Sequence, residues 1–206
     1  MALDSVANLR ASIQSWLMDR TDLAPQCDDF ISLCEGDINR VLRTREMEKT
    51  EDLTPTDGVC TIPTDFLEFR SVRTAVQYGG SLSLVTPDYA DERYFPNFAG
   101  TPKHFTIDGD NLTIFPYAST TVRLRYYRTI PPLTDSNTSN WLLVKYPNAY
   151  LAGCLKYAGA FIGDDGGAAA AAMYGAMFNS TMEALNVEDK RSRWARGGVT
   201  LSGPTP

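Results

Sequence analysis

The chain has 206 residues, of which 43% are hydrophobic and 21% are charged, and its formal net charge is −6. This composition is typical of one large globular domain, or of a domain with a subdomain, and it excludes a chain that is disordered throughout. The acidic balance argues against a general grip on nucleic acid.

Two amphipathic helices open the chain. Apolar residues recur at three- and four-residue spacing, which predicts a first helix over 5–18 with Asp4 as its N-cap. A second helix is predicted over 27–45, with Pro25 well placed at its start. Two such helices in succession should pack as an antiparallel pair.

The apolar period changes from helical to alternating at Met47. The Asp57-Gly58 turn predicts a short hairpin between strands over 50–54 and 59–62. A further strand, containing Leu67 and Val76, is expected to turn at Gly79-Gly80 into a strand over 82–85.

A short helix and a second hairpin follow. Pro87 opens one or two helical turns that reach Tyr94. The clearest hairpin of the sequence joins 104–107 to 112–115. The segment 121–129 then alternates as a strand does, and its two faces consist of Val122, Leu124 and Tyr126 on one side and Arg123, Arg125 and Tyr127 on the other.

The C-terminal part predicts a helical hairpin. An apolar helix over 141–157 has small residues that allow another helix to approach closely, namely Ala149, Ala152, Gly153 and Ala158. A turn over 163–167 reverses the chain into a helix over 168–184, which is expected to continue to about residue 194. Nothing in this hairpin is arranged for chemistry.

The predicted fold is therefore of the α+β class. An N-terminal helix pair and a long C-terminal helical hairpin bracket a β-rich insert of short antiparallel strands, and an extended tail follows. The predicted domains are a helical bundle of 1–46 with 140–196, a β-rich insert of 47–139, and a tail of 197–206 that has little means of folding alone.

The sequence predicts no catalytic residue, cofactor or metal. His104 is the single histidine and lies at the start of a strand without a nucleophile beside it. Asp108 and Asp110 do not begin a calcium loop, because Leu112 and Thr113 occupy positions that need an oxygen ligand and a glycine. Four cysteines without a CxxC spacing make zinc improbable, and no signal peptide or membrane span is evident, so we expect a soluble protein in a reducing, cytosolic compartment.

Charge is unevenly distributed along the chain. From residue 190 onward there are four basic residues and no acidic one, which leaves 25 acidic and 15 basic residues on the rest. A basic tail on an acidic body suits docking on an acidic neighbour, and charge alone favours a solvated, frayed terminus equally well.

The predicted strand over 121–129 has two interpretations. Its arginines, mixed with Tyr126 and Tyr127, resemble a strand face that binds nucleic acid. Alternatively, the face is solvated and its arginines pair with carboxylates of the same or a neighbouring subunit. The acidic body favours the second interpretation.

Six motifs, built mostly of turn and core residues, follow one another along almost the whole chain. They are SIQSWLMDRTDL at 12–23, DDFISLCEGDINRVLRTREME at 28–48, IPTDFLEFRSV at 62–72, GTPKHFTIDGDNLTIFP at 100–116, YYRTIPPLTD at 126–135 and NWLLVKYPNAYLAG at 140–153. In this order they resemble the head-to-tail adaptor proteins of tailed bacteriophages. The Gly-rich turn and alanine run over 163–172 depart from the family, where charge is common.

The resemblance implies a structural virion protein without catalysis. Such adaptors form a ring, commonly of twelve copies, that docks on the portal protein, surrounds the DNA channel and offers an attachment site to a downstream tail or nozzle protein. The expected location is the virion neck, and the host cytoplasm during assembly, with no membrane and with genomic DNA passing without sequence-specific binding. The alternative function is a nucleic-acid-binding accessory protein that uses the Arg/Tyr strand face.

The resemblance also implies where contacts lie. In such rings the C-terminal segment reaches into the portal, which assigns portal binding to Lys190, Arg191, Arg193, Trp194, Arg196, Val199 and Leu201. Ring interfaces are heterologous, so an acidic face must meet a complementary face, for which the candidates are Arg40, Arg43, Arg45, Arg123, Arg125 and Arg128. Twelve copies at −6 would sum to about −72, and a negative lining would let DNA slide without sticking.

Overall fold

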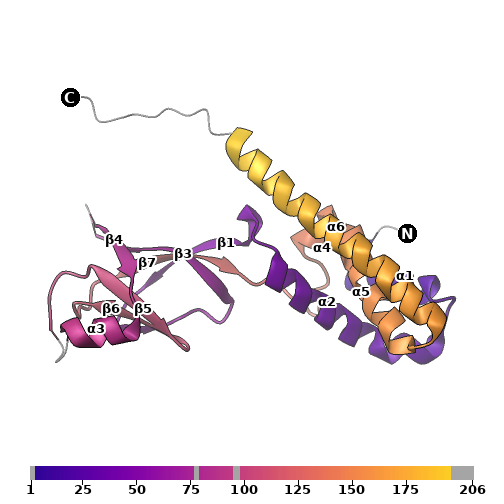
Figure 1. The fold of residues 1–206 in the computed structure, drawn as a ribbon, viewed down its shortest axis with the longest axis horizontal. Coiled ribbons are helices and arrows are strands. Elements are labelled where there is room, and N and C mark those ends of the chain that lie inside the picture. Colours follow the sequence, from indigo (N-terminus) through magenta and orange to yellow (C-terminus); the bar gives the residue numbers. More distant parts are fainter. Residues whose placement is uncertain (1–2, 77–78, 95–97, 196–206) are drawn as a thin grey trace. The chain divides into compact units, whose positions relative to one another are not determined.

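The chain folds into two compact units (Figure 1). This computed structural model describes residues 3–76, 79–94 and 98–195, with side chains as far as Ser192 in the last helix. One unit comprises 1–46 with 130–206 and is helical, and the other comprises 47–129 and is built on a β-sheet. The predicted α+β class is confirmed.

The N-terminal helices are shorter than predicted. α1 is Val6–Trp16, and its N-cap is Ser5 rather than Asp4, because the Ser5 hydroxyl accepts a hydrogen bond from the Asn8 N–H at 3.4 Å. The helix ends before Met18, whose φ of 57° lies in the left-handed region.

Pro25 lies inside a 3-10 helix, η1 (Thr21–Gln26), and α2 follows as Cys27–Val41. α2 ends four residues earlier than predicted, since Leu42 is extended, and the chain continues into a second 3-10 turn, η2 (Arg45–Met47).

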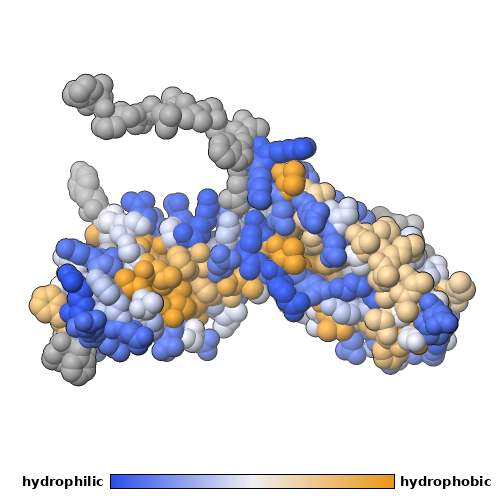
Figure 2. Space-filling model, viewed as in Figure 1, coloured by the Kyte–Doolittle hydropathy of each residue, from blue (hydrophilic) through white to orange (hydrophobic). Residues whose placement is uncertain are grey.

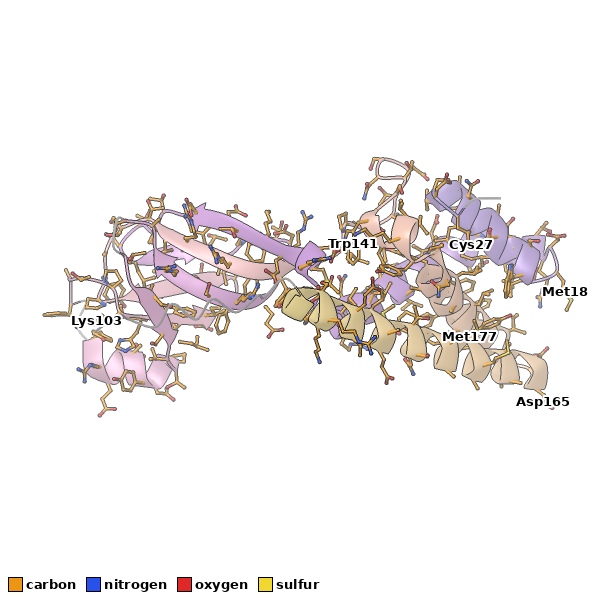
Figure 3. All side chains as sticks on the ribbon, turned by 90° about the horizontal axis from the view of Figure 1, so that it is seen from above. Met18, Cys27, Lys103, Trp141, Asp165 and Met177 are labelled. Carbon is orange, nitrogen blue, oxygen red and sulfur yellow. The ribbon has the colours of Figure 1, made fainter. Side chains whose placement is uncertain are left out.

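The C-terminal hairpin contains one break that the apolar pattern concealed. α4 (Trp141–Lys145) and α5 (Pro147–Ile162) are separate helices, because Tyr146 precedes a proline and takes a non-helical conformation with φ −136° and ψ 61°. α6 (Asp165–Ala195) returns antiparallel to α5 (Figures 1 and 3). The predicted close approach is confirmed at Gly153, where a Cβ would lie against the Cys34 Sγ atom of α2 and 3.0 Å from the Phe178 ring of α6. Gly159, which was not predicted, allows a further close approach, because a Cβ there would lie 2.7 Å from the Gly167 carbonyl oxygen.

A buried polar cluster joins α2 to the segment that precedes α4. The Glu35 Oε1 accepts hydrogen bonds from the Leu133 N–H at 2.8 Å and from the Tyr150 hydroxyl at 3.1 Å. The Asn39 Oδ1 accepts one from the Ile130 N–H at 2.9 Å. These bonds hold 130–139 in the helical unit, whereas the sequence predicts this segment to belong to the β-rich insert of 47–139.

The β unit contains a seven-stranded sheet in the order β1-β7-β3-β4-β5-β6-β2. Its strands are β1 Glu48–Leu53, β2 Val59–Thr61, β3 Phe66–Thr74, β4 Ser81–Leu84, β5 His104–Asp108, β6 Asn111–Phe115 and β7 Val122–Arg128. All pairings are antiparallel except that of β4 with β5. Both halves of the sheet contribute to one core, with Val72, Val122 and Leu124 from β3 and β7 and Phe105, Leu112 and Ile114 from β5 and β6.

One predicted hairpin is wrong. The Asp57-Gly58 turn does form, with φ of 50° and 80° and a bridge between Thr56 and Val59. The strands on either side then separate, because β1 pairs with β7 and β2 pairs with β6. The β3–β4 and β5–β6 hairpins and the alternation of β7 are confirmed.

The predicted helix α3 (Pro87–Tyr94) packs on the outer face of the β5–β6 hairpin. Its buried residues Ala90 and Tyr94 cluster with Phe115, and the Tyr94 ring stacks on the Phe115 ring with centroids 5.6 Å apart. Because Phe105 and Ile107 alternate with His104 and point into the core instead, α3 lies on the side of this hairpin that faces away from the core.

Candidate interaction surfaces

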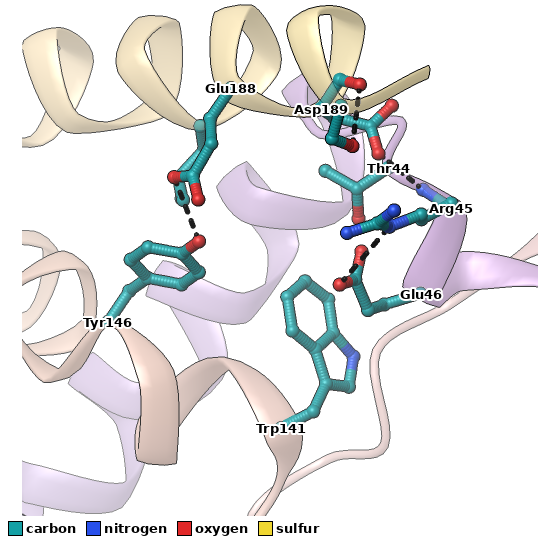
Figure 4. Close-up of a pocket in the computed structure, with 9 residues that line it drawn as sticks. Thr44, Arg45, Glu46, Trp141, Tyr146, Glu188 and Asp189 are labelled. Carbon is teal, nitrogen blue, oxygen red and sulfur yellow. Dashed lines mark hydrogen bonds and ion pairs between the residues drawn. The ribbon is translucent and has the colours of Figure 1, made fainter. Parts of the chain in front are cut away.

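The C-terminal half of α6 is fastened to the helical unit by two neighbouring carboxylates (Figure 4). The Tyr146 hydroxyl donates to Glu188 Oε2 at 2.9 Å, and the Arg45 backbone N–H donates to Asp189 Oδ1 at 3.1 Å. Asp189 is only 8% exposed. Because each carboxylate bonds a different part of the unit, the end of α6 is held in a fixed position.

A small hollow lies between these elements and is lined by Thr44, Glu46, Trp141 and Tyr146, among others (Figure 4). Its volume of about 30 Å³ is close to that of one water molecule and far below the roughly 300 Å³ of a small-molecule site. Burial acts to raise the pKa of Glu46, but the hydrogen bond from Lys145 Nζ at 3.0 Å, a backbone hydrogen bond and the charges of Lys145 and Arg45 together outweigh burial, and the pKa is lowered. The carboxylates of the hollow are bound by neighbouring groups, whereas the buried Thr44 Oγ1 and Trp141 Nε1 atoms have no hydrogen-bond partner among the described residues.

The predicted portal-binding residues follow Glu188 and Asp189 directly in the sequence. Lys190 and Arg191 are exposed on α6. Arg193 and Trp194 belong to its last residues, and Arg196, Val199 and Leu201 lie outside the described residues. The basic segment therefore starts from a helix end that Glu188 and Asp189 hold in place.

The three predicted interface arginines of the helical unit all have local partners. Arg40 forms an ion pair with Asp37 at 3.1 Å, although 77% of its side chain remains exposed. Arg43 donates to the carbonyl oxygens of Asn39 and Leu42, both at 2.7 Å. Arg45 lies 3.7 Å from a Glu46 carboxylate oxygen. Only Arg40 therefore presents most of its side chain to solvent among those three residues.

The arginines of β7 differ from one another. Arg123 is held by Asp52 through two bonds of 2.7 and 2.8 Å, which raise its pKa. Arg125 is exposed on the same face, two residues further along the strand. Arg128 has a buried Nε atom without a hydrogen-bond partner among the described residues.

The two tyrosines of β7 do not lie on one face. Tyr126 is 1% exposed, and its hydroxyl donates to Asp65 at 2.7 Å. Tyr127 alternates with it and shares the outer face with the arginines. The Tyr126 ring is therefore unable to stack on a nucleic-acid base, and only Tyr127 remains for that role.

A third member of this basic face was not predictable from the pattern of β7 alone. Arg73 of β3 lies directly opposite Arg123 of β7, and both lie beside Arg125 in a hollow of about 220 Å³. We name Arg73, Arg123 and Arg125 the basic hollow. The two strands are fifty residues apart in sequence, so only their pairing shows that these side chains meet.

The helical unit also has an apolar groove of about 260 Å³ along α5 and α6. Its lining includes Trp16, Leu151, Leu155, Tyr174 and Met177. Figure 2 shows moderately hydrophobic residues gathered over the N-terminal half of α6 and a mixture of hydrophilic and hydrophobic residues over its C-terminal half. Figure 3 shows Met177 projecting from this helix. Exposed apolar surface of this kind is typical of contacts with other proteins.

Comparison with known proteins identifies the family. A family model described as SU10 adaptor protein matches residues 4–201, nearly the whole chain. The chain belongs to the SU10 adaptor protein family. No curated protein matches the chain. Membership in the SU10 adaptor protein family confirms the resemblance predicted from the six motifs and places the chain among structural adaptor proteins of phages rather than in an enzyme class.

The remaining chemistry-bearing residues of this SU10 family member lie in structural settings. The His104 Nδ1 atom is 2.7 Å from the Tyr94 hydroxyl, and its ring also contacts Tyr89. All four cysteines are free and buried, and burial raises the pKa of Cys60 to about 11. Within the described ranges, no group of three or more His, Cys, Asp or Glu side chains is placed to hold a metal ion. No described helix has the length and apolar character that a bilayer crossing requires.

Proposed function

We propose that this protein is the ring-forming adaptor between the head and the tail of a tailed phage. Twelve copies dock on the portal protein, surround the DNA channel and provide the attachment site for a downstream tail or nozzle protein in the virion neck. The observation that carries the proposal is the match of the SU10 adaptor protein family to residues 4–201.

Portal binding is assigned to the C-terminal segment. The segment from Lys190 onward has basic residues and no acidic ones, while the rest of the chain is acidic. Charge of this kind speeds and orients docking on an acidic surface. Glu188 and Asp189 hold the preceding part of α6 in place, so each copy would present the segment from the same position.

The subunit interface is assigned to exposed arginines that meet carboxylates of the next copy. Arg40 has 77% of its side chain exposed, Arg125 is exposed without a carboxylate partner among the described residues, and Arg123 is partly neutralised by Asp52. The net charge of −6 suits a channel lining that repels DNA, because phosphates are not retained by an acidic surface.

The first experiment measures mass by light scattering, on the protein alone and on its mixture with the purified portal of the same phage. We expect a monomer alone and about one adaptor per portal subunit in the mixture. Absence of association would contradict the proposal. Salt-dependent retention of the isolated protein on DNA would then favour the nucleic-acid-binding alternative.

A second experiment tests the C-terminal segment. A chain ending at residue 195, and a variant with Lys190→Glu and Arg191→Glu, should stay folded and lose portal binding. A matched control reverses two exposed bases elsewhere, Arg20→Glu and Lys103→Glu, and should bind as the wild type does. Normal binding by both test variants would remove the segment from the proposed interface.

A further inference from the structure

We propose that the basic hollow of one copy receives the acidic face of α3 from a second copy, so that the β units associate head to tail. This inference rests on the proposed ring and names the two surfaces that would meet in it. It adds Arg73 to the interface residues and identifies their partners as Asp88, Asp91 and Glu92.

The basic hollow contains charge that its own unit does not neutralise. Arg73 and Arg123 are direct cross-strand neighbours, and like charges in this position destabilise a sheet. Asp52 compensates Arg123 alone, through its two short bonds. Arg73 bonds only the Gly79 carbonyl oxygen, at 3.4 Å, and within the described residues neither Arg73 nor Arg125 forms an ion pair with a carboxylate.

The acidic face of α3 is equally uncompensated. Asp88, Asp91 and Glu92 are exposed, and their spacing of three and four residues places them on one flank of the helix. The opposite side of α3 is buried through Ala90 and Tyr94. Among the described residues, none of the three carboxylates is joined to a base in an ion pair, so the flank is available to a cation outside its own unit.

The two surfaces lie on opposite outer faces of the β unit. The arginines of β7 alternate with Val122, Leu124 and Tyr126, which belong to the core. α3 covers the outer face of the β5–β6 hairpin, which closes the same core from the other half of the sheet. Complementary patches on opposite faces cannot meet in a two-fold dimer, and they join copies head to tail, as a closed ring requires.

A carboxylate partner fits this hollow better than a phosphate backbone does. Nucleic-acid surfaces extend basic charge along a groove or stripe, whereas here Asp52 lies within the face and Glu48 and Glu68 flank Tyr127 on the paired strands. The two arginines that lack an ion pair within the described residues, Arg73 and Arg125, can each meet a carboxylate of the α3 flank through a charge-assisted hydrogen bond.

The test exchanges the charges of the two surfaces. One variant is Arg73→Glu with Arg125→Glu, and the other is Asp91→Lys with Glu92→Lys, which leaves Asp88 at the helix start unchanged. Each variant alone should lose at least about tenfold in apparent affinity for forming the ring on the portal, because every interface would then contain like charges. An equimolar mixture of the two should restore assembly, since alternating copies place glutamates against lysines at one interface and native partners at the next.

The mixture also establishes that both variants are folded. Control variants reverse other exposed charges of the same unit, Asp108→Lys with Asp110→Lys, and should assemble normally. If both test variants assemble as the wild type does, the inference is overturned while the adaptor function stands. If the wild type fails to bind the portal, the proposed function fails and this inference with it. If Arg73→Glu with Arg125→Glu instead abolishes only DNA retention, the hollow contacts DNA and the inference is overturned.

Discussion

Each unit contains one large buried tyrosine whose hydroxyl reaches a carboxylate, and the two sites differ in access to solvent. Tyr150 of α5 is fully buried, and so are its partners Glu35 and Asn140, at 7% exposure each. Tyr126 of β7 is equally buried, but the side chain of its partner Asp65 is 31% exposed. A tyrosine–carboxylate hydrogen bond is therefore buried in the core of the helical unit and lies at the solvent-exposed edge of the core in the β unit.

The helical unit places polar groups inside its core, and the β unit places them at its surface. In the helical unit, Glu35 holds the segment around Leu133 and the helix α5 together inside the core. In the β unit, the Tyr126 hydroxyl also bonds Glu51, which forms an ion pair with Lys49 at the solvent-exposed edge of the core, a position we call the rim. The arginines lie on the outer face of the sheet. Polar groups of the first kind fix the structure, and those of the second kind remain accessible to other molecules.

Removal of the internal carboxylate should have the largest effect. Glu35→Ala leaves the Leu133 amide and the Tyr150 hydroxyl without an acceptor, and we expect a loss of about 3 kcal/mol in the free energy of unfolding. All three tryptophans, Trp16, Trp141 and Trp194, belong to the helical unit, so urea titrations followed by their fluorescence report on this unit.

Glu35→Gln is the matched control, because its carbonyl oxygen can accept both hydrogen bonds. We expect its unfolding free energy to stay within about 1 kcal/mol of the wild type. Equal losses for Glu35→Ala and Glu35→Gln would mean that the charge, and not the pair of hydrogen bonds, stabilises the site.

The two tyrosines test the comparison directly. Tyr150→Phe should cost about 2 kcal/mol, because the bond to a buried carboxylate is lost where water does not replace it. Tyr126→Phe should cost no more than about 1 kcal/mol, since Asp65 keeps Lys49 at 3.0 Å and contacts solvent. Hydrogen exchange measures both losses by one method, from the protection of the α5 amides in Tyr150→Phe and of the β7 amides in Tyr126→Phe, each compared with the wild type. A larger loss for Tyr126→Phe would contradict the assignment of its site to the rim.

A smaller effect should appear as a pH dependence of the helical unit. Burial raises the pKa of Glu35, and the hydrogen bonds from Leu133 and Tyr150 only partly oppose this. A raised pKa in the folded state means that the contribution to stability is complete below the unfolded pKa, about 4.3 for glutamate, and is lost as pH rises through the folded value. The wild type should therefore lose stability relative to Glu35→Gln between pH 4 and pH 7. A constant difference across this range would show that the pKa of Glu35 is the same in both states.

The sequence predicted the parts of this architecture that local signals determine. The β5–β6 hairpin and α3 follow from a Gly-containing turn and from a proline at a helix start. The pairing of β1 with β7 joins strands about seventy residues apart, and β1 (EKTED with a final Leu) has too few apolar residues to show which face is buried. Arg73 was missed for the same reason, because its proximity to Arg123 depends on a long-range register.

The smallest expected effect concerns the ion pair on the outer face of the β unit. Asp52 and Arg123 are both about half exposed, so Asp52→Asn should leave the unfolding free energy unchanged within error. The same change frees the Arg123 guanidinium and makes the basic hollow more positive. If this face meets carboxylates of the next copy, Asp52→Asn should preserve or strengthen ring formation on the portal, as measured by light scattering. A clear loss of stability would show that the pair is structural and that the β unit uses its surface charges as the helical unit uses Glu35.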